Sequence, residues 1–436
     1  MKLARASGAR AAIAPPSGAG VHRVRLYLRS LDPRLPRVVW ILQAGELAYA
    51  FGLGVVMPFL IIYLHDVRGI SLTTAGLAAA ANGLGAMPAG AASGVLADRF
   101  GPKRVVVWAL LVETIAIACF PFIRAGWHAL VLDLVLGAGN GAFWTSESSL
   151  LALLTPEDRR HAAFAQERAT LNLGIGLGGL AGGAIAVASR PGTFSILFAI
   201  DALTFLGFAG LLVARVPSPP LARRDGAGDS YRVVLRDRAF VALLALNTTL
   251  IAAGIVPFVE FLPVYAKHVA GVHEGAIGLV FFANTMAVVL LQLSVARALE
   301  GRRRMPALAL MGALWAGVWL VVPAAVETLA APSAALVLAG AAIVLGAGEC
   351  MHGAVHGALV AELAAPALLG RYMALSSLSW QLAFVIGPAL GGAVLDAHPV
   401  ALWLAAAGAC ALAAASALVL ERVLPARLRR TPTRGA

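Results

Sequence analysis

Acidic side chains lie inside long apolar stretches of this sequence. Six stand well within such stretches and a seventh stands near the end of one: Glu46, Glu113, Asp133, Asp201, Glu260, Glu349 and Glu147. At the centre of a membrane helix an ionised carboxylate costs about 2.5–3.5 kcal/mol. Acids kept there therefore need a reason, such as carrying a proton or contacting a cationic ligand. The alternative for each is a protonated carboxyl group that bonds to the backbone or to water.

Two histidines share one face of a predicted helix. His352 and His356 are four residues apart, and Glu349 precedes His352 by about one turn. Such a set can bind a metal ion, but no further ligand is evident and no metal site is assigned. Imidazoles also titrate near neutral pH, which suits proton coupling or substrate contact, and structural hydrogen bonding is the third reading. The proton-coupling candidates are Glu46, Asp133, Glu349 and His352.

Motifs of common enzymes are absent from the sequence. It contains no HExxH zinc-protease motif, no GxxxxGK[ST] phosphate-binding loop and no GxSxG nucleophile turn. We therefore expect no enzymatic activity, no cofactor and no direct use of ATP.

The elements that carry these side chains are predicted to be membrane helices. The chain is 60% apolar and 13% charged, whereas soluble proteins are about half apolar and about a quarter charged. A hydrocarbon core of about 30 Å requires spans of about 20 residues. Such spans are expected at 38–64, 72–96, 105–123, 128–153, 165–188, 193–214, 239–265, 275–297, 305–325, 333–363, 373–397 and 400–420. The fold class is thus an all-α integral membrane protein with 12 transmembrane helices.

We attribute the net charge of +12 to the orientation of the chain in the membrane rather than to binding of a nucleic acid. Of the 34 basic residues, 29 lie in the two tails and the even-numbered connections. This positive-inside bias predicts that both termini are cytoplasmic. The first 31 residues lack acids, and we interpret them as a solvated tail rather than a transit peptide. No secretory signal is expected before the first span. The three cysteines fall within spans, as buried apolar residues without a disulfide framework.

The spans divide into two halves whose sequences resemble each other. The longest polar stretch follows Pro217 and reads as a linker. The expected parts are a basic cytoplasmic tail (1–37), a six-helix bundle (38–214), a cytoplasmic linker (215–238), a second six-helix bundle (239–420) and a basic cytoplasmic tail (421–436). A shift of 209 residues superimposes the glycine-rich runs 178–183 and 387–392. Repeated halves of this kind are typical of transporters that rock two bundles about a central site.

The connection between the second and third spans carries the most specific motif. It reads Gly94-Val95-Leu96-Ala97-Asp98-Arg99-Phe100-Gly101-Pro102-Lys103-Arg104. This resembles the signature of the major facilitator superfamily at the same place, with Pro102 in place of a usual basic residue. The resemblance covers all twelve spans and implies two pseudo-symmetric bundles.

The resemblance also implies a gating role for the motif. Asp98 would lie near the positive N-terminus of the eleventh helix, around Arg371, and hold the cytoplasmic side shut. The alternative is that the motif sets topology alone, which accounts for the basic residues but not for the aspartate and the glycines. The gating candidates are Gly94, Asp98, Arg99, Gly101, Lys103, Arg104, Gly178, Gly182, Arg371, Gly387, Pro388 and Gly391.

Within this superfamily, the chain looks most like the bacterial drug-exporter-like branch. Its fifth span resembles the glycine-rich exporter motif, although Gly179 stands where proline is usual and the proline appears in span eleven as Pro388. Asp133 stands where many drug–proton antiporters carry Arg, so that residue's proton-relay role is not carried over. Arg outnumbers Lys 31 to 3, which suggests a GC-rich bacterial genome.

The resemblance implies a secondary transporter that exports small, drug-like or metabolite molecules in exchange for protons. Proton-coupled uptake and export of one dedicated metabolite stay open. A channel or a non-transporting receptor fits less well, because the repeat, the gating loop and the acids would be unneeded. The expected partners are a small-molecule substrate, protons and the lipid bilayer, for a monomer in the bacterial cytoplasmic membrane and without nucleic acid.

The resemblance further implies that helices one, four, seven and ten line the cavity. These helices carry the acids Glu46, Asp133, Glu147, Glu260 and Glu349. Large aromatic groups and amides in these and other spans suit ligands that are apolar with a few polar groups. For any single residue, helix packing or an interhelical hydrogen bond is the alternative. The cavity candidates are Trp144, Glu147, Asn172, Phe258, Glu260, Asn284, His356, Trp380 and Gln381.

Overall fold

A computed structural model describes residues 35–218, 231–365 and 368–431 of the chain. The first group of helices begins with a broken helix, made of α2 (Arg37–Val56), η1 (Met57–Phe59), α3 (Leu60–Ile62) and η2 (Tyr63–Val67). It continues with α4 (Leu72–Phe100), α5 (Pro102–Cys119), η3 (Phe120–Phe122), α6 (Gly126–Leu154), η4 (Glu157–Arg159), α7 (Arg160–Ile185) and α8 (Gly192–Arg215).

A second group follows the short helix α9 (Tyr231–Val234) and also begins with a broken helix. This helix consists of α10 (Arg238–Leu250), η5 (Ile251–Ile255), η6 (Pro257–Phe261) and α11 (Leu262–Ala270). The others are α12 (Glu274–Leu299), α13 (Arg304–Thr328), α14 (Ala331–Leu363), α15 (Leu369–Ala397) and α16 (Pro399–Val423), with the short η8 (Ala426–Leu428) after them.

Each of the twelve predicted spans coincides with one of these helical segments. Nine segments in the described part of the chain are long and apolar enough to cross a membrane. The other three, α4, α6 and α7, have 26 to 29 residues and pack among them. The all-α membrane fold predicted from composition is therefore confirmed.

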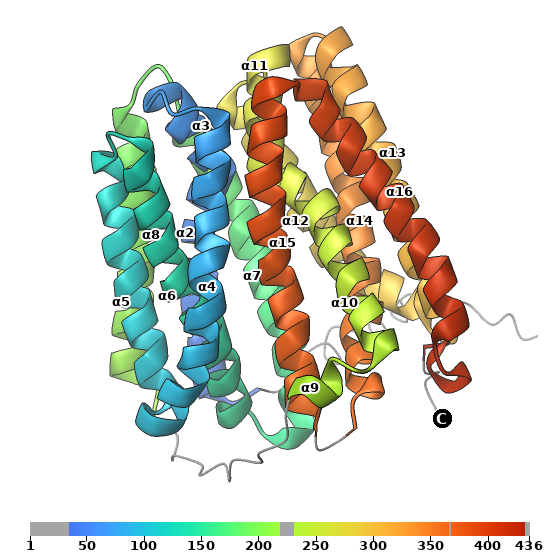
Figure 1. Ribbon diagram of the computed structural model, residues 1–436. Coiled ribbons are helices and arrows are strands. Elements are labelled where there is room, and N and C mark those ends of the chain that lie inside the picture. The colour runs from blue at the N-terminus through green and yellow to red at the C-terminus, as the bar shows by residue number, and fades with distance from the viewer. Residues whose placement is uncertain (1–34, 219–230, 366–367, 432–436) are drawn as a thin grey trace, which may run out of the picture.

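The two groups of helices repeat the same packing (Figure 1). In the first bundle, α2 packs on α7 and α8, α4 on α6, and α5 on α6 and α8. In the second bundle, α10 packs on α15 and α16, α12 on α14, and α13 on α14 and α16. The bundles meet where α4 lies against α15 and α7 against α12. This is the pseudo-symmetric arrangement that the repeat predicted, while the exact domain boundaries stay predictions.

Glycines give α7 two flat faces, one for each bundle. A Cβ at Gly178 or Gly182 would overlap backbone atoms of α2, in the same bundle. A Cβ at Gly179 or Gly183 would meet residues of α12, in the opposite bundle. Residues four apart share one helix face, so the glycine-rich run serves packing within the bundle and contact between bundles at once.

The second glycine-rich run has the same two faces on α15. Gly387 and Gly391 face side chains of the broken helix of their own bundle. A Cβ at Gly392 would lie 2.6 Å from the backbone oxygen of Leu72, at the start of α4. The match predicted from the sequence repeat therefore extends to which bundle each glycine faces.

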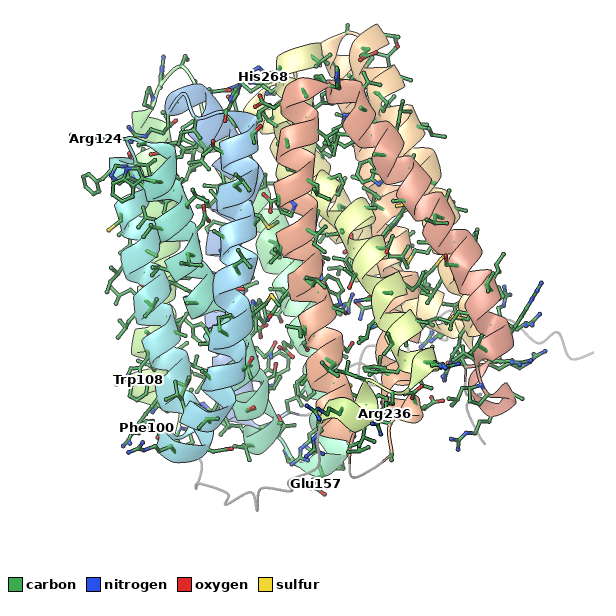
Figure 2. All side chains as sticks on the ribbon, in the orientation of Figure 1. Phe100, Trp108, Arg124, Glu157, Arg236 and His268 are labelled. Carbon is green, nitrogen blue, oxygen red and sulfur yellow. The ribbon has the colours of Figure 1, made fainter. Side chains whose placement is uncertain are left out.

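The connections lie at two distinct ends of the molecule. Figure 2 shows Phe100, Glu157 and Arg236 at one end, which we call the basic end, and Arg124 and His268 at the opposite end. At the basic end, Gly101 and Gly301 occupy corresponding connections with φ of 87° and 70°. Side chains other than glycine rarely adopt this conformation, which explains both glycines.

The predicted tails and linker lie partly outside the described residues, which exclude 1–34, 219–230 and 432–436. The described end of the C-terminal segment bonds to the connection before α13. There the backbone N–H of Arg304 donates to the oxygen of Arg429 at 2.8 Å, and that of Thr431 donates to the oxygen of Arg302 at 3.0 Å.

Candidate functional site

Three carboxylates meet inside the first bundle, toward the basic end. Glu46 comes from α2, Glu147 from α6 and Glu167 from α7, and their ligand oxygens all lie within 4.8 Å of one another. Glu46 and Glu147 are fully buried; Glu46 has no hydrogen-bond partner in the described part of the chain, and Glu147 interacts with the carboxyl group of Glu167. Carboxylates this close cannot all be ionised. The group therefore holds a proton or a cation.

The surroundings of this acidic group are polar as well. Gln43 lies one turn before Glu46 on α2, and both atoms of its buried amide lack a partner among the described residues. The hydroxyl of Ser146, next to Glu147, is likewise buried without one. Buried polar atoms without partners are rare and costly, so their gathering around three carboxylates marks this region for function.

A second site joins the two bundles at α14. Glu349 accepts a hydrogen bond from Asn284 of α12 at 2.9 Å. Arg168 reaches α14 from α7, in the other bundle, and interacts electrostatically with Glu349. Its guanidinium lies 3.1 Å from the position of a Cβ on Gly353. The predicted proton-coupling residue Glu349 thus has an amide beside it and a cation facing it across the bundle interface.

The predicted histidine pair belongs to a hydrogen-bond network. His352 Nε2 lies 2.6 Å from Asn247 Oδ1, and Asn247 in turn donates to Ser379 at 2.7 Å. His356 Nε2 lies 3.0 Å from the Ser376 hydroxyl. The imidazole rings stack with centroids 4.8 Å apart, and within the described residues no third metal-ligating atom joins them. Of the three readings left open by the sequence, this geometry favours hydrogen bonding.

Asp133 and Glu260 face each other across the bundles. Asp133 of α6 is buried, and its Oδ2 has no partner among the described residues. It interacts electrostatically with Glu260 of η6, in the second bundle. These two candidates, 127 residues apart in the sequence, are therefore brought together.

The remaining cavity candidates are dispersed. Trp144 packs edge-on to Tyr49 with ring centroids 5.9 Å apart, and Phe258 stacks on Phe281 at 4.6 Å. The rest contact neighbouring groups as follows: Asn172 donates to the backbone of Arg168, Trp380 meets the His352 ring, and Gln381 lies against Gly90 of α4. Their roles in substrate binding stay predictions.

The residues of the connection motif have several contacts. Lys103 Nζ donates to the backbone oxygen of Val216 at 2.5 Å, just after the C-terminal end of α8, where a cation is favourable. The Arg99 guanidinium lies 5.1 Å from the Phe100 ring centroid. A Cβ at Gly94 would meet no atom of the described residues within 4 Å. The pairing of Asp98 with the start of α15 near Arg371 stays a prediction, as does a role for Arg104.

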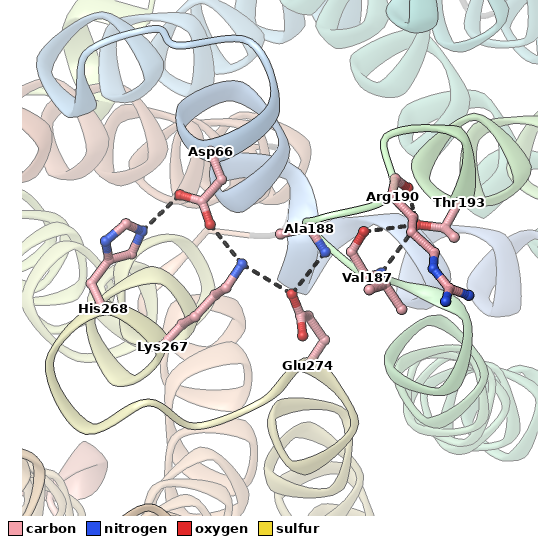
Figure 3. A network of polar contacts seen from close by, with 8 residues as sticks. All are labelled: Asp66, Val187, Ala188, Arg190, Thr193, Lys267, His268 and Glu274. Carbon is pink, nitrogen blue, oxygen red and sulfur yellow. Dashed lines mark hydrogen bonds and ion pairs between the residues drawn. The ribbon is translucent and has the colours of Figure 1, made fainter.

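Ion pairs bridge the bundles at the opposite end (Figure 3). Lys267 Nζ, in α11, lies 2.6 Å from Asp66 Oδ2 in η2. The same ammonium lies 3.0 Å from Glu274 Oε1, which accepts from the backbone N–H of Ala188 at 3.1 Å. Nearby, Thr73 donates to Asp396 at 2.7 Å, joining α4 to α15. These contacts join the two bundles at the opposite end.

Sequence reasoning missed several of these residues. Glu167 is not among the candidates from the sequence; it stands near the start of its span and directly precedes the intramembrane Arg168. The bridge at the opposite end was also missed. One signal was available, because Lys267 is one of only four basic residues in the connections on that side.

Comparison with solved structures gives the fold. The peptide transporter POT in complex with sulfate superimposes with a TM-score of 0.75 and 19% identity, over 91% of this chain and 96% of that chain. The inward open xylose transporter XylE from E. coli superimposes with a TM-score of 0.70 and 18% identity, over 89% and 96% respectively.

Sequence comparison gives the family. The uncharacterized MFS-type transporter YqjV of Bacillus subtilis (strain 168) is 25% identical over 370 residues, covering 82% of this chain and 86% of that protein. The multidrug resistance protein MdtG of Serratia proteamaculans (strain 568) is 27% identical over 174 residues, covering 39% and 42%. The Major Facilitator Superfamily profile matches residues 44–341 and 271–436, and the chain therefore belongs to this superfamily of transporters.

Proposed function

We propose that this chain is a secondary transporter that exports small molecules in exchange for protons, by alternating access. The observation that carries the proposal is the buried group Glu46, Glu147 and Glu167, which must hold a proton or a cation. Ionised carboxylates inside a membrane protein are energetically expensive. Their retention is explained if protonation and deprotonation are steps of the transport cycle.

The mechanism follows from competition for these acids. Substrate enters from the basic end, and a proton taken up from the opposite side neutralises a carboxylate. Arg168 and Glu349 lie on different bundles, so protonation of Glu349 weakens an attraction across the bundle interface. Inward proton flow then drives the bundles through the rocking motion that releases substrate on the other side.

The closed opposite end supports entry of substrate from the basic end. Glycine contacts between α4 and α15 lie near Gly76 and Gly83, toward the opposite end of α4. At Gly94, toward the basic end, no described atom lies within 4 Å of the position of a Cβ. The bundles are thus in closest contact away from the side that we propose is cytoplasmic.

The direction of transport is the finer part of the proposal. Efflux rests on the similarity to multidrug resistance proteins such as MdtG, at 27% identity. Uptake by symport, the second candidate, would use the same acids. We further propose that the protein is a monomer in the bacterial cytoplasmic membrane and that both termini are cytoplasmic. Reporter fusions at each terminus would test the location of the termini.

The test uses purified protein in liposomes, with an imposed pH gradient and a pH-sensitive dye inside. Lipophilic cations, neutral drugs and sugars are added in turn. We expect a substrate-dependent proton flux that Glu147→Gln and Glu349→Gln each abolish. Glu113→Gln is the matched control, because Glu113 is an equally buried acid whose Oε1 accepts from Tyr49 at 3.4 Å within the first bundle.

The outcomes separate the candidates. Proton flux opposite to substrate flux indicates antiport, and flux in the same direction indicates symport. Coupled flux that survives both Gln substitutions would refute the assigned role of the acids. Loss of flux in Glu113→Gln alone would point to the acids of the Tyr49 network instead.

A further inference from the structure

Two histidines and an aspartate converge at the opposite end, outside the acidic group described above. His65 and Asp66 lie in η2 of the first bundle, and His268 lies in α11 of the second. One ligand atom from each lies within 4.8 Å of the others. The two imidazole ring centroids are 5.3 Å apart. Two imidazoles and one carboxylate are a ligand set that zinc-type cations prefer.

A hydrogen bond sets the tautomer of His65 that metal binding requires. Its Nδ1 lies 2.9 Å from the backbone oxygen of Ile70. Because a carbonyl oxygen can only accept, Nδ1 carries the hydrogen and donates it. The lone pair of a neutral ring is then on Nε2. Metal-binding histidines in proteins almost always have this second-shell bond, which sets the tautomer and orients the ring.

Both oxygens of Asp66 have partners, and one of them faces a second proposed ligand. Its Oδ2 accepts from Lys267 at 2.6 Å, and its Oδ1 accepts from His268 Nε2 at 2.7 Å. A metal ion would replace the hydrogen between Oδ1 and Nε2, while Lys267 continues to orient the carboxylate through Oδ2. Asp66 and Glu274 carry two negative charges against the one positive charge of Lys267, so this network has an excess negative charge for a cation.

The site is also reachable and close to the required size. The His268 side chain is 46% exposed, so solution at the opposite end has access to it. Ligands about 2.0–2.1 Å from one tetrahedral ion lie about 3.3 Å apart. In this structure the three ligand atoms lie within 4.8 Å of one another. Side-chain movements of about one to two ångströms would therefore bring them to the spacing of metal ligands.

We propose that His65, Asp66 and His268 form a binding site for a divalent transition-metal cation of the zinc class, with water in the fourth position. The ligands come from both bundles, so a bound ion ties the bundles together at the opposite end. Binding then favours the closed state of that end. The site does not depend on the transported substrate or on proton coupling.

Metal binding is measured first, on the full-length chain without an affinity tag. Calorimetric titration with ZnCl₂ should show one site, and Co²⁺ should give the visible absorption of tetrahedral coordination. His65→Ala and His268→Ala should each weaken binding by at least about tenfold. His268→Cys, which supplies another zinc ligand, should retain binding. His398→Ala is the matched control, an exposed histidine at the same end.

Closure of the opposite end is measured second. Spin labels on Arg124→Cys and Ala330→Cys, in a Cys119→Ser background, report the distance between the bundles at that end. Zn²⁺ should increase the short-distance population in the otherwise unchanged chain, EDTA should reverse this, and His65→Ala should remove the response. The proposed site is refuted if the chain binds no zinc, or if the His65→Ala/His268→Ala double variant binds it equally well. Zinc binding without a change in distance would refute the bridging role.

Discussion

Removing the Lys267 ammonium should open the bundles at the opposite end. Lys267 lies 2.6 Å from Asp66 and 3.0 Å from Glu274, and these side chains are only 13% to 20% exposed. A hydrogen bond to a charged group contributes about 1.5–3 kcal/mol. Lys267→Met breaks two of them, but Asp66 retains His268 and Glu274 retains the N–H of Ala188. We therefore expect a net loss of about 2–3 kcal/mol, below the sum of two such bonds.

This loss of free energy can be expressed as a change in the ratio of closed to open molecules. A change of about 2–3 kcal/mol alters the ratio of closed to open molecules about 30- to 150-fold. Each bundle keeps its own packing, so the stability of the separate bundles should not change. The spin-label pair at Arg124→Cys and Ala330→Cys, measured in EDTA, should show a shift from the short to the long distance.

Two comparisons make the result specific. Arg190→Met removes a basic residue of the same end that lies outside the bridge and should leave the distances unchanged. Adding Asp66→Asn to Lys267→Met should produce less than the sum of the two single effects, because both act on one interaction. A distance distribution unchanged by Lys267→Met would refute the conclusion that these ion pairs hold the end closed.

Further predictions concern the glycine contacts, the core and the acidic group. Gly76→Leu should separate the bundles in the same spin-label assay, because a Cβ there overlaps the Pro388 oxygen. Gly94→Leu should have a smaller effect, because no described atom lies within 4 Å of its Cβ position; equal effects would contradict the assigned contact. Trp315→Ala should cost about 3–5 kcal/mol in unfolding by denaturant, since the side chain is fully buried and bonds to Leu345 at 3.1 Å; a cost under about 1 kcal/mol would contradict the packing. Glu147→Gln should leave thermal stability equal or higher, because a neutral amide replaces one of three carboxyl groups that cannot all be ionised; a marked loss would mean that the ionised group is a structural partner.

Much of the helical architecture followed from local sequence properties. Long apolar runs must satisfy their backbone hydrogen bonds internally in lipid, and helices do so within one segment. Helix positions were therefore predictable without knowledge of packing. The glycine-rich runs were also recognisable, since their spacing repeats across 209 residues. Even so, only the structure showed that Gly178 faces its own bundle and Gly179 the other.

The candidate site was predictable in its chemistry but not in its grouping. Apolar surroundings marked Glu46, Glu147 and Glu349 as unusual. They did not indicate that Glu46 and Glu147 meet Glu167, or that Arg168 faces Glu349, because these contacts depend on helix rotation and on which helices adjoin. Hydropathy carries little information on either property.

The sequence by itself determined the membrane class, the helices, the two-fold repeat and the types of side chain available for proton transfer. Those follow from composition and spacing, which act locally along the chain. The tertiary structure decided which distant residues became partners, as for Asp66 and His268, which are 202 positions apart. Their contact depends on how the two bundles close, and that depends on shape complementarity summed over helix faces rather than on any short segment.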